Sequence, residues 1–129
     1  MSIGPYAAVR AGGFDRAHEL GAVPVAITFG ERLLGLIGKR DRDALCLLIP
    51  RCTSVHTWFM RSPIDILFLD RRDRVLAVTE RARAWRSYSG PRGTCTVLEL
   101  PPGRAKEMGV RAGDYVWYDA PSRRSRFRR

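Results

Sequence analysis

The stretch from Leu45 to Asp70, LCLLIPRCTSVHTWFMRSPIDILFLD, constrains the fold more than any other part of this chain. The apolar residues here come in short runs, at 44–49 and 64–69, with Pro50 and Pro63 beside them. Short apolar runs bounded by prolines are typical of strands that are buried on both faces. Polar and soft side chains in such a region cost free energy when they are buried, so their presence needs an explanation. The side chains of this kind are Cys52, His56, Thr57, Trp58, Met60 and Asp65.

The rest of the chain repeats this pattern of short apolar segments separated by turn residues. Six or seven short strands with two small helices are typical of a compact, mostly antiparallel barrel or sandwich. We therefore predict a mainly-β (β-rich α+β) fold, a small single-domain antiparallel β-barrel with one or two short helices. Residues 81–93 are expected to be less regular. Strands are predicted at 23–29, 44–49, 55–59, 64–69, 75–79, 94–100 and 114–118, and helical turns at 31–37 and 104–108.

The chain is strongly basic, and part of the excess lies at its end. It has 129 residues and a formal net charge of +10, and the sequence ends in PSRRSRFRR. We expect residues 1–121 to form one domain and residues 122–129 to be a disordered, solubilising tail. Alternatively, the tail binds the phosphates of single-stranded nucleic acid or RNA, and the protein acts through it. The tail arginines are Arg123, Arg124, Arg126, Arg128 and Arg129.

Cysteine usage and the lengths of the apolar runs indicate the compartment. The three cysteines and two histidines include no C-x-x-C pair, so no zinc site is predicted. An odd number of cysteines without paired spacing is typical of reduced thiols in a cytosolic protein. No secretory signal opens the sequence, and no apolar run reaches the ~18–20 residues that a membrane span needs. We therefore expect a cytoplasmic protein without a cofactor.

The motif Pro50-x-Cys52-x-x-x-His56-Thr57-x-x-Met60-x-x-Pro63-x-Asp65 resembles the signature of DUF192 (UPF0127), a prokaryotic family catalogued as a domain of unknown function. The resemblance covers roughly residues 23–119 and implies a small β-barrel, but no activity. Ser62 departs from the pattern, because family members usually carry a bulky apolar residue there. Three blocks carry the resemblance: Arg32-x-x-Gly35-Leu36; Pro50-x-Cys52-x-x-x-His56-Thr57-x-x-Met60-x-x-Pro63-x-Asp65; and Val97-Leu98-Glu99-Leu100 followed by Gly103, Gly109 and Gly113-Asp114.

Cys52, His56 and Met60 follow one another at intervals of four residues, and their ligand atoms suit a soft metal such as Cu(I). In an extended strand, which rises ~3.3 Å per residue, neighbouring members of this set lie roughly 13 Å apart. One ion needs ligand atoms within ~2–2.3 Å. A straight strand cannot bring the three side chains to one ion, so we predict no metal site.

His56 and Asp65 are the more promising pair. If strands 55–59 and 64–69 form a hairpin, His56 and Trp58 lie opposite Asp65 and Leu67. Three interpretations follow: a satisfied polar cluster that pins the turn, a contact for a ligand, or a general acid/base pair. No obvious nucleophile accompanies the pair.

Glu99 lies inside the predicted apolar strand 94–100. We expect this strand to be at the edge of a sheet with Glu99 leaning into solvent, which is a common arrangement. The alternative is that Glu99 is a carboxylate of the functional site.

The favoured function is a non-enzymatic ligand-binding or accessory module that takes a small molecule or a protein partner. His56 and Asp65 would make the polar contacts, and Trp58 and Met60 would form an apolar wall. One alternative is an enzyme, hydrolase-like or other, that uses His56 and Asp65 as acid and base; the other is action through the basic tail. The sequence indicates no oligomeric state. The predicted ligand surface consists of Cys52, His56, Thr57, Trp58, Met60 and Asp65.

Overall fold

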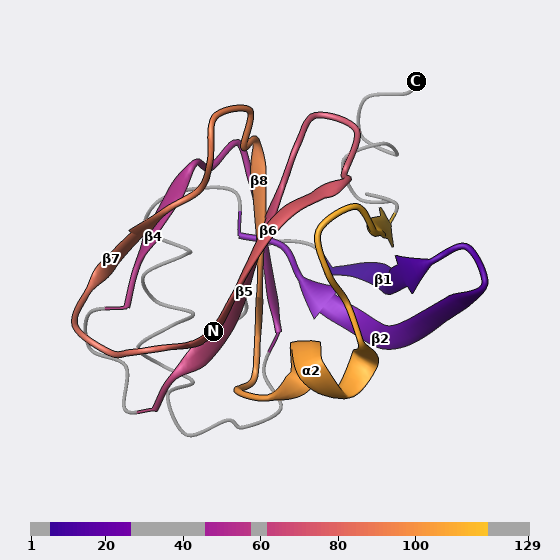
Figure 1. Cartoon of the computed structure of the whole chain (residues 1–129), viewed down its shortest axis with the longest axis horizontal. Coiled ribbons are helices and arrows are strands. Elements are labelled where there is room, and N and C mark those ends of the chain that lie inside the picture. Colours follow the sequence, from indigo (N-terminus) through magenta and orange to yellow (C-terminus); the bar gives the residue numbers. More distant parts are fainter. Residues whose placement is uncertain (1–5, 27–45, 58–61, 119–129) are drawn as a thin grey trace.

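Short antiparallel strands make up most of the fold (Figure 1). The computed structural model describes residues 6–26, 46–57 and 62–118. The prediction of a mainly-β, antiparallel fold is confirmed. The described elements are β1 (Tyr6–Gly13), β2 (Arg16–Pro24), β3 (Leu47–Pro50), β4 (Ser54–His56), β5 (Ile64–Leu69), β6 (Val75–Ala82), β7 (Ser87–Ser89), β8 (Thr96–Leu100), α2 (Arg104–Met108) and β9 (Tyr115–Tyr118).

An N-terminal hairpin, β1–β2, opens the fold and was missing from the predicted strands. β1 alternates between buried and exposed residues, with Ala7, Val9 and Ala11 facing the interior. Such alternation is typical of a strand with one buried face. β1 also pairs with β9, which gives an antiparallel sheet in the order β2-β1-β9.

The central sheet has the order β3-β8-β5-β6, and every neighbouring pair in it is antiparallel. β5 and β8 are buried along their whole length because a hydrophobic core covers each face of the sheet. The first core contains Leu67 and Leu69 and extends to β1, β2, β9 and α2. The second core contains Ile66 and Phe68 and extends to β4. A strand whose successive side chains enter two cores reads as a continuous apolar run.

The third sheet consists of β4 and β7 alone and packs on the second core through Val55 and Tyr88. Figure 1 shows it to the left of the central sheet, with the β1–β2 hairpin to the right. The hairpin expected between 55–59 and 64–69 is wrong, because β4 pairs with β7 while β5 pairs with β6 and β8. The segment 81–93, expected to be irregular, supplies β7.

The sheets meet without closing into one barrel among the described strands. A single parallel bridge, Val25 to Leu48, joins the end of β2 to the central sheet. The helical turns predicted at 104–108 are present as α2, while those predicted at 31–37, and the tail at 122–129, lie outside the described residues. Within the described ranges no helix has the length and apolar character to cross a membrane.

Candidate functional site

Thr57 is the residue of the predicted surface whose role is clearest. Its side chain is fully buried, and its hydroxyl donates to the carbonyl of Arg83 at 2.6 Å. The same oxygen accepts the backbone N–H of Arg86 at 3.0 Å. The Thr57 N–H in turn donates to the carbonyl oxygen of Arg86 at 2.8 Å. Because a buried polar group must be hydrogen-bonded, threonine at this position ties the end of β4 to the segment 83–86. The Thr57 hydroxyl is thus bonded within the protein.

Trp85 lies in the segment that these hydrogen bonds from Thr57 hold, which we call the clasp, and its side chain extends into solvent. Its backbone N–H donates to the Thr57 carbonyl at 2.8 Å, and its side chain is 61% exposed. Its φ of 62° lies in the left-handed region, which costs free energy for a residue with a bulky side chain. Such strain persists only where the surrounding contacts fix the backbone. An indole held outward at that cost is a feature that sequence reasoning missed.

His56 is the last residue of β4, which pairs with β7, and it is exposed. In the β4–β7 register it stands opposite Ser87, and its Nδ1 lies 2.8 Å from the Ser87 hydroxyl oxygen. The imidazole and the hydroxyl are both hydrogen-bonding groups at the protein surface. Of the predicted surface residues that the structure describes, His56 is the one open to solvent.

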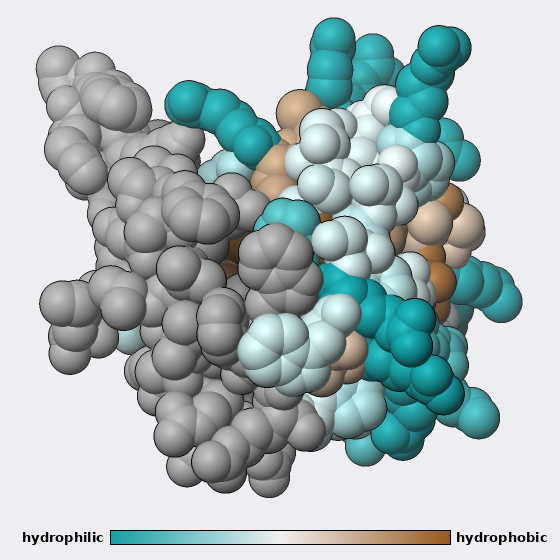
Figure 2. All heavy atoms as spheres, turned by 90° about the vertical axis from the view of Figure 1, so that its left-hand side faces the viewer, coloured by the Kyte–Doolittle hydropathy of each residue, from teal (hydrophilic) through white to brown (hydrophobic). Residues whose placement is uncertain are grey.

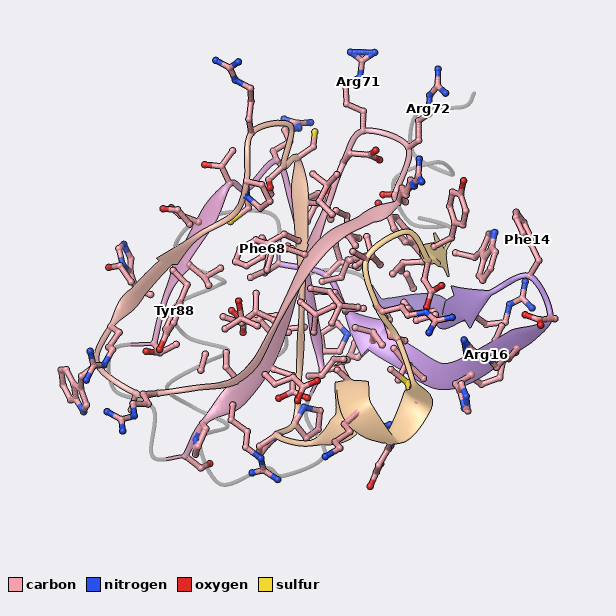
Figure 3. All side chains as sticks on the ribbon, in the orientation of Figure 1. Phe14, Arg16, Phe68, Arg71, Arg72 and Tyr88 are labelled. Atoms are coloured by element: carbon pink, nitrogen blue, oxygen red, sulfur yellow. The ribbon has the colours of Figure 1, made fainter. Side chains whose placement is uncertain are left out.

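Figure 2 shows the face of the molecule that carries β4 and β7, and its described part is mostly white, of intermediate hydropathy, and teal, which is hydrophilic, with smaller brown patches. Arg83 and Arg86, which lie on either side of Trp85 in the sequence, are exposed. On the inner side of β7, Tyr88 lies toward the interior, where Phe68 of β5 also points (Figure 3). The hydroxyl of Tyr88 accepts the Arg83 N–H at 2.8 Å, which adds a second tie to the segment that carries Trp85.

Asp65 was expected to pair with His56, and this expectation is wrong. Its carboxylate is completely buried and accepts two backbone N–H groups, from Arg81 to Oδ1 and from Ala105 to Oδ2, both at 2.9 Å. Asp65 sits between Ile64 and Ile66 on β5, which enter the second core, so its side chain points to the opposite face of the sheet. His56 is on the strand pair that covers the second core, and the central sheet separates the two side chains.

Of the three cysteines, Cys52 is buried, and Cys46 and Cys95 are half-buried. Cys52 is buried, and its thiol donates to the carbonyl of Ser54 at 3.0 Å. Burial raises the pKa of the Cys46 thiol, and the positive charge of Arg104 lowers it by a smaller amount. A thiol that stays protonated at neutral pH is a poor nucleophile and a poor metal ligand. Within residues 6–26, 46–57 and 62–118, no cluster of His, Cys, Asp and Glu side chains is arranged to hold a metal ion.

Glu99 does not occupy an edge strand, so the expectation that it leans into solvent is wrong. It is 3% exposed, and β8 lies between β3 and β5, with Leu47 and Ile66 as its cross-strand neighbours. Trp58, Met60 and the tail arginines lie outside the described residues. Of the predicted surface, the described residues are therefore the exposed His56, the buried Thr57 and Cys52 near β4, and the buried Asp65 on the opposite face of the central sheet.

The sequence is similar to one family model and to several curated proteins. The DUF192 model, described as an uncharacterised ACR, matches residues 12–118. A UPF0127 protein of Pyrococcus horikoshii is 35% identical over 103 residues, which are 76% of this chain and 89% of that protein. A UPF0127 protein of Thermococcus sibiricus is 33% identical over 110 residues, covering 81% of this chain and 71% of that protein. The family description and these names state no activity.

Two solved structures resemble the fold. A proposed transcription regulator from Sinorhizobium meliloti has a TM-score of 0.79 at 24% identity, covering 92% of this chain and 96% of that chain. A protein of unknown function from Novosphingobium aromaticivorans has a TM-score of 0.74 at 23% identity, covering 85% of this chain and 83% of that chain. At these identities the likeness concerns the fold alone.

Proposed function

The chain belongs to the DUF192 (UPF0127) family, and from that premise we propose that it is a non-enzymatic binding domain whose ligand surface lies on β4 and β7. In this proposal Trp85 stacks on the ligand, and His56 and Ser87 make its polar contacts. Indole faces bind flat or weakly apolar rings, while a few well-placed polar groups supply orientation.

One observation carries the proposal: Trp85 is both exposed and fixed. The clasp from Thr57 bonds the backbone on both sides of the indole, at Arg83 and Arg86, and at Trp85 itself. A backbone that is already held in place does not have to be ordered when a ligand binds, which favours affinity.

Charge narrows the class of ligand. Arg83 and Arg86 are exposed on either side of Trp85, so the surface favours a molecule with a negative group. A ring with hydroxyl groups matches the indole and the His56–Ser87 pair. The proposed ligand class is therefore a small anionic sugar or a molecule of similar shape.

The acid/base alternative loses its support from the geometry. Asp65 faces the first core and binds backbone N–H groups of Arg81 and Ala105, so it cannot orient or charge the His56 ring directly.

Thermal denaturation of the full chain against a panel of acidic and phosphorylated sugars tests the proposal. A ligand at 100 times its Kd adds about 2.7 kcal/mol of stability, which is several degrees for a domain of this size. We expect the shift to disappear in His56→Ala and in Trp85→Ala. Phe14→Ala, which removes an exposed aromatic ring from a different sheet, is the matched control and is expected to keep it. A shift that survives in Trp85→Ala, or no shift across the panel, contradicts the proposal.

A further inference from the structure

A second aromatic group, with one exposed and two half-buried rings, lies at the other end of the molecule, on the outer face of the β2-β1-β9 sheet. It consists of Phe14 from the β1–β2 turn and Tyr115 and Trp117 from β9, and we refer to it as the aromatic surface. The ring centroids are 5.3 Å apart for Phe14 and Tyr115 and 5.9 Å apart for Phe14 and Trp117. Phe14 is 84% exposed and lies at the tip of the hairpin (Figure 3). Phe14 is therefore not held in place by burial in the protein interior.

Arginines flank the aromatic surface on both sides. Arg10 of β1 is directly opposite Trp117, and its guanidinium carbon lies 5.1 Å from the centre of the indole ring. On the other side of β9, Arg74 forms an antiparallel bridge with Tyr115 and is exposed. Residues directly opposite in antiparallel pairs point to the same face. The two arginines and the β9 rings therefore share one face.

Glycine at position 12 keeps this face open. Gly12 stands opposite Tyr115 in the β1–β9 register and adds no side chain there, so Phe14 packs beside the tyrosine ring. Its φ is 140°, and a Cβ at this position would lie 2.2 Å from the carbonyl oxygen of Arg16. The hairpin can adopt this shape only with glycine at that position.

The other edge of β9 is held by the turn at 70–74. The Val116 N–H donates to the Asp73 carbonyl at 2.9 Å, and the Tyr118 hydroxyl donates to Asp73 Oδ1 at 2.9 Å. Arg71 and Arg72 project from this turn into solvent (Figure 3). β9 is thus fixed between β1 and a turn that presents positive charge.

Acidic residues also lie near the aromatic surface, namely Glu19, Asp70, Asp73 and the exposed Asp15 next to Phe14. Glu19 lies 4.0 Å from Arg10, but both side chains are exposed, and such pairs contribute little to stability. Asp70 is engaged by the backbone N–H groups of Arg72 and Arg74. An incoming phosphate can replace Glu19 at Arg10 at small cost, and the chain as a whole carries +10.

We propose that the aromatic surface is a binding platform for single-stranded nucleic acid. Bases stack on Phe14 and on the β9 rings, and backbone phosphates bind Arg10 and Arg74. Single-strand binders combine aromatic rings for stacking with a positively charged track for the backbone, and both are present here on one face. The platform lies on a different sheet from His56 and Trp85, so it is independent of the ligand surface proposed above.

Fluorescence anisotropy of the full chain with labelled ten-nucleotide dT and rU oligomers tests this proposal. Loss of one stacked base in Phe14→Ala is expected to raise the Kd roughly 5-fold or more, while Phe14→Tyr keeps the affinity. Because Phe14 is solvent-exposed, the circular dichroism spectrum and the melting curve of the Phe14→Ala variant are expected to match those of the parent protein. Trp85→Ala is the aromatic control and leaves the Kd unchanged.

A salt series tests the phosphate contacts. For single strands each contact contributes about 0.7 to the slope of log K against log salt concentration, so Arg74→Ala lowers the slope by about 0.7. Arg92→Ala removes the same charge from an exposed turn outside the aromatic surface and leaves the slope nearer to that of the parent. Equal Kd values for Phe14→Ala and the parent overturn the proposal. Equal affinity for a duplex of the same length also overturns it. The dT and rU arms distinguish DNA from RNA.

Discussion

Replacement of Asp65 is the most direct test of how the interior is organised. Helix α2 begins after Gly103, which has no side chain to cap it, and φ at this glycine is 87°. The N–H groups of a first helical turn have no partner within the helix. Asp65, forty positions earlier in the chain, accepts the Ala105 N–H of that turn, and its other oxygen accepts the Arg81 N–H. Asp65, a residue of strand β5, therefore caps the start of helix α2.

The expected loss of stability on replacing Asp65 follows from these two hydrogen bonds. A hydrogen bond to a charged group contributes about 1.5–3 kcal/mol, and a buried donor left without a partner costs a similar amount. Asp65→Ala removes both bonds and leaves the Arg81 and Ala105 N–H groups without an acceptor. We therefore expect it to lower the free energy of unfolding by about 3–5 kcal/mol. Asp65→Asn keeps one acceptor oxygen but turns an NH₂ group toward the other donor, so about 2–3 kcal/mol is expected. The total free energy of unfolding of a small domain is only about 5–15 kcal/mol.

Urea unfolding followed by tryptophan fluorescence and by circular dichroism measures the effect. With a slope of about 2 kcal/mol per molar, the midpoint of Asp65→Ala falls by about 2 M. His56→Ala, at an exposed position, is the control and is expected to move the midpoint by less than about 0.5 M. If Asp65→Ala unfolds at the midpoint of the parent, the carboxylate is not a structural cap, and the argument that separates it from His56 fails.

Three further substitutions test other parts of the fold by the same unfolding measurement. Thr57→Val keeps the shape but removes the hydroxyl that clasps segment 83–86, and about 1–3 kcal/mol of stability is expected to be lost. Gly12→Ala, whose Cβ would meet a backbone oxygen at 2.2 Å, is expected to cost more than Gly21→Ala, where φ is 76° and no atom lies within 4 Å; equal costs would contradict the hairpin geometry. Burial raises the pKa of Asp73 above 3.8, with a bond from Tyr118 opposing the shift. The ionised carboxylate therefore costs stability at pH 7, so Asp73→Asn is expected to be more stable than the parent there. This advantage should shrink as the pH falls through the raised pKa and vanish below 3.8; an advantage that grew on acidification would contradict the sign.

Strands that enter two cores were the easiest part of the fold to predict from the sequence. β5 and β8 are runs of apolar residues bounded by proline or polar turns, and burial on both faces imposes that composition whatever the neighbours are. β1 was harder to recognise, because its inward residues Ala7, Val9 and Ala11 are small and its sequence contains two glycines. Alternation between buried and exposed positions was the available signal.

Strand pairing and the site depend on contacts between distant residues. The turn at 60–63 suggested a hairpin, yet β4 pairs with β7, which lies 31 positions away at the His56–Ser87 contact. That pairing is decided by which apolar side chains fill the second core, not by the local turn. It also brings Trp85 and Ser87 to His56, although nothing in their local sequence connects them.

By itself, the sequence determined that the chain is mainly β and which residue types stand out against its apolar runs, because both follow from composition and period along one strand. It also identified Thr57 and Asp65 as polar residues that need an explanation. The tertiary structure decided what that explanation is: Thr57 clasps the segment that exposes Trp85, and Asp65 caps a helix on the opposite face of the sheet from His56. A buried polar side chain must find a hydrogen-bonding partner, but only the folded arrangement of strands decides which backbone groups lie within reach.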